Sequence, residues 1–257
     1  MSLNFPILLV GKRIAAADTS TPPLPLLWWD LDDDGVWANQ GTETGAGWDL
    51  SEGGTVATTT ATIGSTSRTF CNMGLTAYLE YDNAGTKTVA HPSTSEDLSL
   101  SAWVNYTSVG TTFGEIINHR GATTDRNYQM VISDDDKNAA YAQFDDLDVL
   151  VVETDVADAL TASTWYHLCT TFDASTGTGK FYINGTLVKT ATDAAVDTIG
   201  TGAAPFALGT AAWSKGQSNL GFNGNMCRVG VFDEVLTTAQ ITTLAEGDAR
   251  PYSEIWT

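Results

Sequence analysis

Three aspartates at alternate positions are the residues of this sequence best suited to hold a metal ion. Asp30, Asp32 and Asp34 fit the pattern D-x-D-x-D-G that opens an acidic calcium loop. Carboxylate oxygens are the ligands that a hard cation such as Ca²⁺ prefers. The bidentate Glu expected at the twelfth loop position is absent, because Gly41 stands there. The pattern therefore indicates either a Ca²⁺ site in an unusual loop or three solvated turn acids.

Three tryptophans in loops are the candidates for ligand binding. Trp213 lies in the polar stretch 209–219. Trp37 and Trp48 lie in the long loop after the first predicted strand, residues 26–30. Aromatic rings stack on the faces of sugars and anchor protein interfaces. The same residues also close hydrophobic cores. The sequence leaves both interpretations open for each of the three.

Composition limits what the protein does. The 257 residues include 31 acidic and 12 basic side chains, for a net charge of -19, and this charge argues against a nucleic-acid partner. Hydrophobic residues make up 42% of the chain, as in a globular protein. No apolar run approaches the roughly 18 residues of a membrane span. Cys71, Cys169 and Cys227 lack metal-ligand spacing, and we expect Cys169 and Cys227, which lie in predicted strands, to be buried free thiols. This usage suggests a protein made in a reducing cytoplasm.

Residues 1–25 differ in composition from the rest of the chain. Lys12 and Arg13 outnumber the single acid Asp18, and the segment ends in a proline-rich spacer. The apolar run 5–10 is shorter than a usual signal core and precedes the basic pair, so we predict an N-terminal arm and linker, not a signal peptide. We expect the arm to dock in one of two ways. It binds a neighbouring subunit of a homo-oligomer or larger assembly, or it folds back onto its own domain.

The sequence pattern of residues 26–257 predicts one domain built of short strands. Residues 98–106 alternate strictly, which predicts that Leu98, Leu100, Ala102 and Val104 share one face. Asn184 and Gly185 separate two β runs and predict a tight hairpin. Thr237 and Gln240 form a capping box that predicts one short C-terminal helix. Many short strands joined by polar turns predict an all-β, two-sheet antiparallel sandwich.

Several motifs, taken in order, resemble laminin G-like domains. Residues 78–82, 100–104, 165–167, 181–188 and 229–232 resemble the strands and the hairpin of that family. It is the pentraxin-like branch of the concanavalin A-like lectin/glucanase superfamily. The resemblance implies a jelly roll of two antiparallel sheets from about residue 26 to residue 248. It also implies a calcium site with a carboxylate after the turn at residues 222–224, where this chain has Asn225 to Arg228 instead.

An acidic motif supports an enzymatic alternative. Glu153, Asp155 and Asp158 resemble the E-x-D-x-x-E signature of the laminarinase-type glycosidases in the same superfamily. The resemblance implies a retaining hydrolase with Glu153 as nucleophile and Asp158 as proton donor. The last acid is shorter than the Glu of the signature, and acidic spacings recur by chance in a chain this rich in Asp.

The expected function is that of a non-catalytic binding or assembly module. The arm, the absence of a signal peptide and the absence of a full catalytic set favour a virion surface component, such as a phage capsid-decoration or tail-associated protein. Such a protein would bind a glycan or neighbouring virion proteins. A lectin of the bacterial cell surface, or secreted, and the glycosidase with Glu153 and Asp158 are the alternatives.

Overall fold

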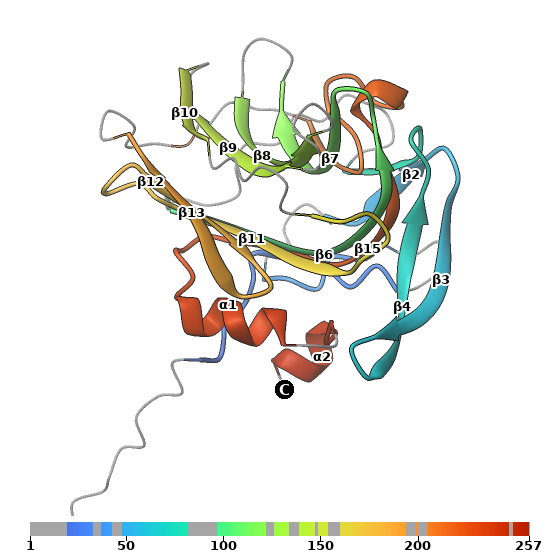
Figure 1. Ribbon diagram of the computed structural model, residues 1–257, viewed down its shortest axis with the longest axis horizontal. Helices are drawn as coiled ribbons and strands as arrows, with labels where there is room; N and C mark the ends of the chain where they lie inside the picture. The colour runs from blue at the N-terminus through green and yellow to red at the C-terminus, as the bar shows by residue number, and fades with distance from the viewer. Residues whose placement is uncertain are drawn as a thin grey trace, which may run out of the picture.

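The protein folds as two antiparallel sheets packed face to face, with two short helices beneath one of them, as Figure 1 shows. This computed structural model describes residues 20–32, 37–42, 48–81, 97–121, 126–133, 139–146, 149–153, 160–193, 199, 205–246 and 249–256. The arrangement confirms the predicted all-β jelly-roll sandwich. Of the described residues, no helix has the length and apolar composition needed to cross a membrane.

The eight-stranded sheet lies next to the helices. Within the described residues its strands follow the order β13-β12-β11-β6-β15-β4-β3, and β1 pairs with the end of β15. The bounds are β1 Leu27–Trp29, β3 Val56–Ile63, β4 Thr66–Met73, β6 Leu98–Val109, β11 Tyr166–Asp173, β12 Thr178–Ile183, β13 Thr186–Thr192 and β15 Phe222–Phe232.

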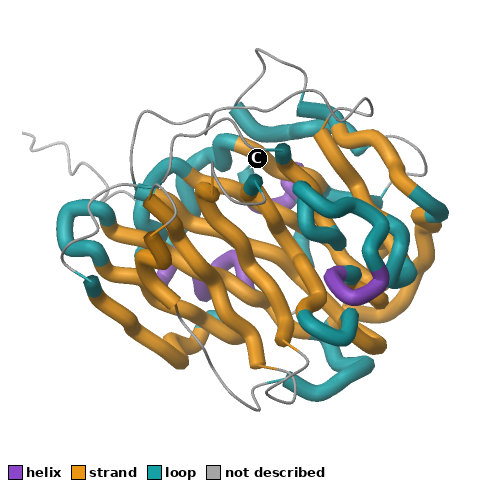
Figure 2. The backbone as a smooth tube through the Cα atoms, turned by 90° about the horizontal axis from the view of Figure 1, so that it is seen from above, coloured by secondary structure: helices purple, strands orange, loops and turns teal. Residues whose placement is uncertain are grey.

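The seven-stranded sheet forms the other layer. Its described strands follow the order β10-β9-β8-β7-β14-β5-β2. The bounds are β2 Leu50–Gly53, β5 Tyr78–Tyr81, β7 Phe113–Arg120, β8 Arg126–Ser133, β9 Ala139–Asp146, β10 Val149–Glu153 and β14 Phe206–Leu208. Figure 2 looks onto this layer and shows its strands side by side, with the loop that contains η1 (Ser218–Leu220) crossing in front of them.

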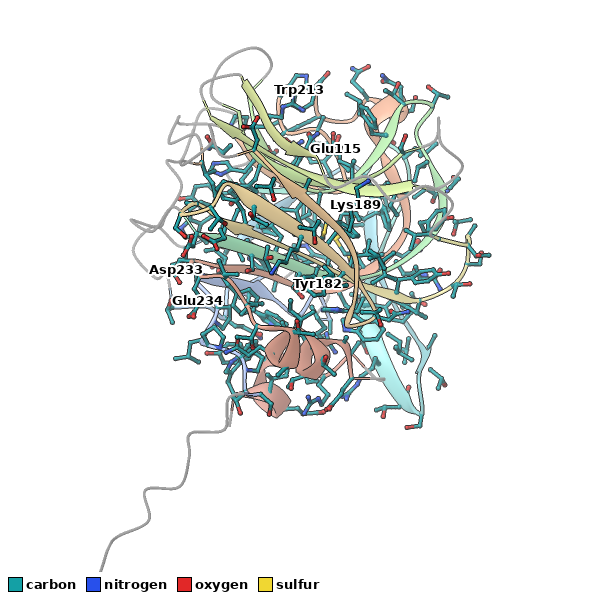
Figure 3. The ribbon with its side chains drawn as sticks, turned by 60° about the vertical axis from the view of Figure 1, so that its left-hand side comes forward. Glu115, Tyr182, Lys189, Trp213, Asp233 and Glu234 are labelled. Atoms are coloured by element: carbon teal, nitrogen blue, oxygen red, sulfur yellow. The ribbon has the colours of Figure 1, made fainter. Side chains whose placement is uncertain are left out.

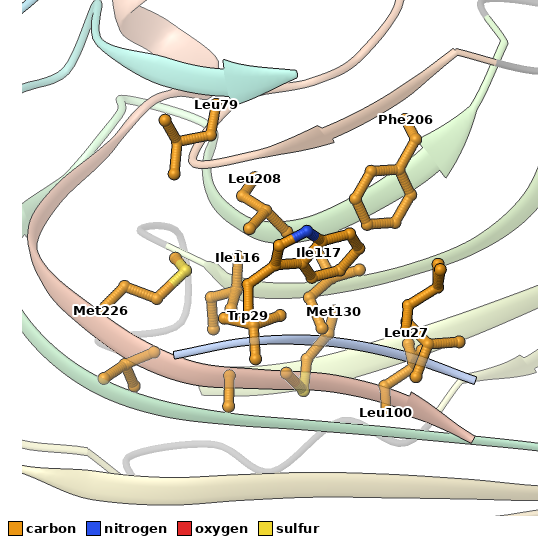
Figure 4. Close-up of a cluster of buried hydrophobic side chains, with 14 of the residues drawn as sticks. Leu27, Trp29, Leu79, Leu100, Ile116, Ile117, Met130, Phe206, Leu208 and Met226 are labelled. Carbon is orange, nitrogen blue, oxygen red and sulfur yellow. The ribbon is translucent and has the colours of Figure 1, made fainter. Parts of the chain in front are cut away.

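The main core fills the space between the sheets. The predicted alternation on β6 is confirmed, because its four apolar residues from Leu98 to Val104 all lie in this core. Trp29 of β1 meets Phe206 of the opposite sheet at a ring-centroid distance of 5.4 Å, and Figure 4 shows the two sheets contributing to one cluster. This apolar interior sets the orientation of each strand, since residues of a strand alternate between its two faces.

Local signals in the sequence agree with local structure. Asn184 and Gly185 join β12 to β13 with φ angles of 50° and 78°, the positive values that a two-residue hairpin turn requires. Helix α1 (Thr238–Ala245) begins at the predicted capping box of Thr237 and Gln240. A one-turn helix, α2 (Tyr252–Ile255), follows and was not predicted. Both helices cover the outer face of the eight-stranded sheet (Figure 1). The three cysteines are free and buried, which confirms the prediction for Cys169 and Cys227.

Candidate functional site

A row of polar residues crosses the outer face of the seven-stranded sheet. Cross-strand pairing aligns one residue from each strand, and directly paired residues share a face. The row, called the polar row below, consists of Ser51, Glu80, Asn118 and Gln129, with Ala207 of β14 between Glu80 and Asn118. The neighbours Leu79, Ile117 and Leu208 point the other way, into the core. The polar row therefore faces away from the eight-stranded sheet.

A loop after β14 covers the centre of the polar row. The side-chain oxygen of Asn118 accepts the backbone N–H of Ala212 at 3.1 Å, and the Lys215 ammonium pairs with the Glu80 carboxylate. These two contacts hold residues 209–216 against the sheet. The loop in turn presents Trp213, which is half-buried and is labelled in Figure 3 at the end of the molecule opposite the helices.

Arg120 joins the polar row to Trp213. Its guanidinium donates to Gln129 Oε1 at 2.9 Å and lies 5.5 Å from the centroid of the Trp213 ring. Gln129 Oε1 also accepts from Asn118 Nδ2 at 3.3 Å. Asn118 and Gln129 are buried, whereas Arg120 and Trp213 remain partly exposed. The buried amides thus position a cation and an indole ring at the surface.

Glu115 is a buried carboxyl beside this group. Its Oε2 atom accepts from Asn118 Nδ2 at 3.1 Å, and its Oε1 atom makes no hydrogen bond to the part of the chain that the structure describes. Burial raises the pKa of Glu115 to about 8, although the Asn118 hydrogen bond and the Arg120 charge oppose the shift. Glu115 is therefore mostly protonated at neutral pH.

A laminin G model of the concanavalin A-like lectin/glucanases superfamily matches residues 80–242. The chain belongs to that superfamily. No curated protein sequence matches this laminin G-like chain.

Solved structures share the fold at low sequence identity. Domain 4 of the arabinanase AbnA from Geobacillus stearothermophilus, in complex with arabinotriose, is 19% identical, with a TM-score of 0.57 over 87% of this chain and 100% of that chain. The botulinum neurotoxin serotype D ligand binding domain in complex with N-acetylneuraminic acid is 12% identical, with a TM-score of 0.57 over 89% of this chain and 51% of that one. The binding domain of Paraclostridial Mosquitocidal Protein 1 is 9% identical, with a TM-score of 0.58 over 86% and 52%. These identities establish the fold alone.

The aspartates proposed as Ca²⁺ ligands contact an arginine in this laminin G-like domain. Arg228 donates to the Asp30 carbonyl at 2.6 Å and to Asp32 Oδ2 at 3.3 Å, and its Nε lies 3.7 Å from Asp30 Oδ1. The Asp30 carboxylate also accepts from Trp28 Nε1 at 2.8 Å and from the Tyr252 N–H at 2.9 Å. Asp34 lies outside the described residues. Because a guanidinium already occupies the space beside Asp30 and Asp32, these residues do not fit a Ca²⁺ site.

Two of the three candidate tryptophans belong to the core. Trp37 and Trp48 are each 3% exposed. Trp37 Nε1 donates to Glu52 Oε1 at 2.8 Å, and Trp48 stacks on Tyr81 at a centroid distance of 4.5 Å. Neither offers a ring face to a ligand, so neither belongs to the candidate site. Trp213 stays in it.

The residues of the enzymatic alternative are only partly described. Glu153 ends β10, and its backbone pairs in register with that of Gln143 in β9. Asp155 and Asp158 lie outside the described residues.

A buried Ser–His pair was missed by sequence reasoning. Ser101 Oγ lies 2.9 Å from His167 Nε2, and both residues are fully buried. Burial lowers the pKa of His167 to about 3, so the ring is neutral. The pair lies beneath Trp103, whose Nε1 donates to the Leu244 carbonyl of α1. Its sealed position assigns it to packing.

Proposed function

We propose that the protein is a non-catalytic carbohydrate-binding module, and that its ligand-binding surface is the outer face of the seven-stranded sheet around Trp213 and Arg120. The observation that carries the proposal is the polar row with a partly exposed indole and guanidinium above it. Sugars offer hydroxyl groups to amides and cations and offer C–H faces to aromatic rings. A site of few polar groups around an aromatic residue suits such a ligand.

Two further observations support binding without catalysis. The carboxylate of Glu80 is paired with Lys215, and Glu115 is fully buried, so neither presents a free carboxylate to a glycosidic bond. Two solved structures of the same fold are complexes with arabinotriose and with N-acetylneuraminic acid. Those ligands support the proposed class of ligand for this chain.

A glycan array tests the function. We expect the purified protein to bind one or more oligosaccharides and to leave them intact. No binding to any glycan would contradict the proposal. The release of reducing ends from β-glucans, abolished by Glu153→Gln, would establish the hydrolase instead.

For the biological setting we propose the surface of a virion, with residues 1–19 attaching the domain to neighbouring virion proteins; a bacterial cell surface is the alternative. The spacer is held on its own domain, because the Trp256 indole donates to the carbonyls of Pro22 and Pro23 at 3.0 Å and the Thr42 N–H donates to the Pro25 carbonyl at 2.9 Å. Residues 21–23 therefore lie beside the C-terminal helices.

A truncation at residue 20 tests the attachment. We expect deletion of residues 1–19 to leave the thermal unfolding of the domain unchanged, because the contacts of residues 21–25 are kept. The truncated protein should no longer join native particles when these are examined by electron microscopy. Normal incorporation of the truncated protein would contradict an attachment role.

A further inference from the structure

Strand β3 forms an unpaired edge of the eight-stranded sheet. It pairs with β4 along its whole length without a bulge, from Val56 opposite Met73 to Ile63 opposite Thr66. No described strand pairs with its other side, and Figure 1 shows it at the margin of the molecule. Ala57 and the residues from Thr59 to Thr62 are exposed. A row of backbone N–H and C=O groups on such an edge is a template for another strand.

The other edges of the two sheets carry protective features that β3 lacks. Proteins shield edges with charged side chains, bulges or very short strands. Strand β13 carries Lys189, β2 is four residues long and contains Glu52, and β10 has a register shift beside its partner. Strand β3 has eight residues, no charged side chain and no proline. Its sequence favours addition of a strand.

The charge distribution favours a second copy of the chain as the added partner. The protein has 31 acidic residues, so two copies repel each other over most of their surfaces. Between Glu52 and Glu80 the sequence contains no Asp or Glu, and this interval includes all of β3 and β4. Glu254 of α2 reaches β4, but it is paired there with Arg68. The β3 edge is thus a place where two acidic copies can approach with little repulsion.

The sequence of β3 also matches itself in antiparallel pairing. Residues 57–61 read Ala-Thr-Thr-Thr-Ala in either direction. A twofold axis at Thr59 places Thr59 opposite the partner's Thr59, Thr58 opposite the partner's Thr60 and Ala57 opposite the partner's Ala61. Thr–Thr pairs across antiparallel strands are favourable. A twofold interface requires this kind of self-complementary surface.

We propose that β3 is a dimer interface, at which two copies of the chain join their eight-stranded sheets into one continuous sheet through antiparallel β3–β3 pairing centred on Thr59. The pairing is strand addition between identical edges. It leaves the outer face of the seven-stranded sheet uncovered, so the proposed ligand sites of both copies stay accessible.

A charged substitution on the axis tests the interface. In Thr59→Lys the two ammonium groups would lie opposite each other, and we expect dimerisation measured by sedimentation velocity to weaken by at least about tenfold. Thr190→Lys is the matched control, since Thr190 is an exposed threonine on the opposite edge strand, β13. The control variant should dimerise like the wild type. A monomeric wild type, or a dimer that survives Thr59→Lys, would overturn the proposal.

Disulfide trapping tests the register. Paired Cα atoms in antiparallel strands are roughly 4.5–5.5 Å apart, within the range of a disulfide. Thr59→Cys should therefore cross-link two copies under mild oxidation. Ala57→Cys should not, because the two Ala57 positions would be about 13 Å apart. The native cysteines are buried and give a low background. Equal cross-linking of both variants would contradict pairing about Thr59.

Discussion

Replacing Arg228 with methionine will lower the free energy of unfolding by about 3–5 kcal/mol, because it leaves a buried carboxylate without its cation. Arg228 is 2% exposed and Asp30 6% exposed. Arg228 also donates from Nε to the Ala249 carbonyl at 2.9 Å and adopts a φ of 53° beside the register shift in β15. Its guanidinium thus ties the start of the domain to its last residues.

Urea unfolding of matched variants measures this effect. Arg250→Met is the control, because the Arg250–Glu246 pair lies on the surface and such pairs contribute about 0–1 kcal/mol. Adding Asp30→Asn to Arg228→Met should recover part of the loss, since it removes the uncompensated charge. A loss below about 1 kcal/mol for Arg228→Met would show that the guanidinium does not stabilise the fold.

The Glu115 carboxyl is expected to make the protein less stable as the pH rises. Its pKa is about 8 in the folded protein, against an ordinary value of 4.5. Between these values the folded protein binds a proton that the unfolded chain has released. The free energy of unfolding therefore falls as the pH rises through this window and levels off above about pH 8, by up to about 5 kcal/mol in all.

Glu115→Gln should remove that part of the pH dependence. The amide keeps an oxygen that can accept from Asn118 Nδ2 but does not titrate in this range. Urea unfolding at about pH 5 and about pH 8.5 compares the two proteins. Glu246→Gln, an exposed control, should keep the wild-type profile. An unchanged profile in Glu115→Gln would mean that Glu115 ionises normally in the folded protein.

Short sequence patterns predicted the structural features that neighbouring residues form. The candidate site could not be predicted in this way, because its residues are far apart in the sequence. The alternation in residues 98–104, the Asn184–Gly185 turn and the Thr237 capping box each act within a few residues, and each was confirmed. The polar row brings together residues from five strands, from Ser51 of β2 to Ala207 of β14, so only the sheet order reveals it.

Long-range pairing also explains why the sequence left two interpretations open for the aspartates and the tryptophans. The aspartates of the acidic loop suggested a cation, but the cation that contacts Asp30 and Asp32 is a side chain far away in the sequence, Arg228. Trp37 and Trp48 lie in connecting segments, yet both close the core at the end of the sandwich, because their rings pack on residues of the sheets. Sequence position alone does not distinguish such tryptophans from the half-buried Trp213.

The measurement that tests the proposed ligand face most directly is titration of Trp213→Ala with a glycan that binds the wild type. Removing an aromatic anchor from a binding site costs about 2 kcal/mol or more, so we predict at least about tenfold weaker binding by calorimetry. Trp165→Ala is the control, because Trp165 is also partly buried but packs on Phe70 against the eight-stranded sheet. Weaker binding in Trp213→Ala alone would support the outer face of the seven-stranded sheet as the ligand site. Unchanged affinity in Trp213→Ala would contradict it.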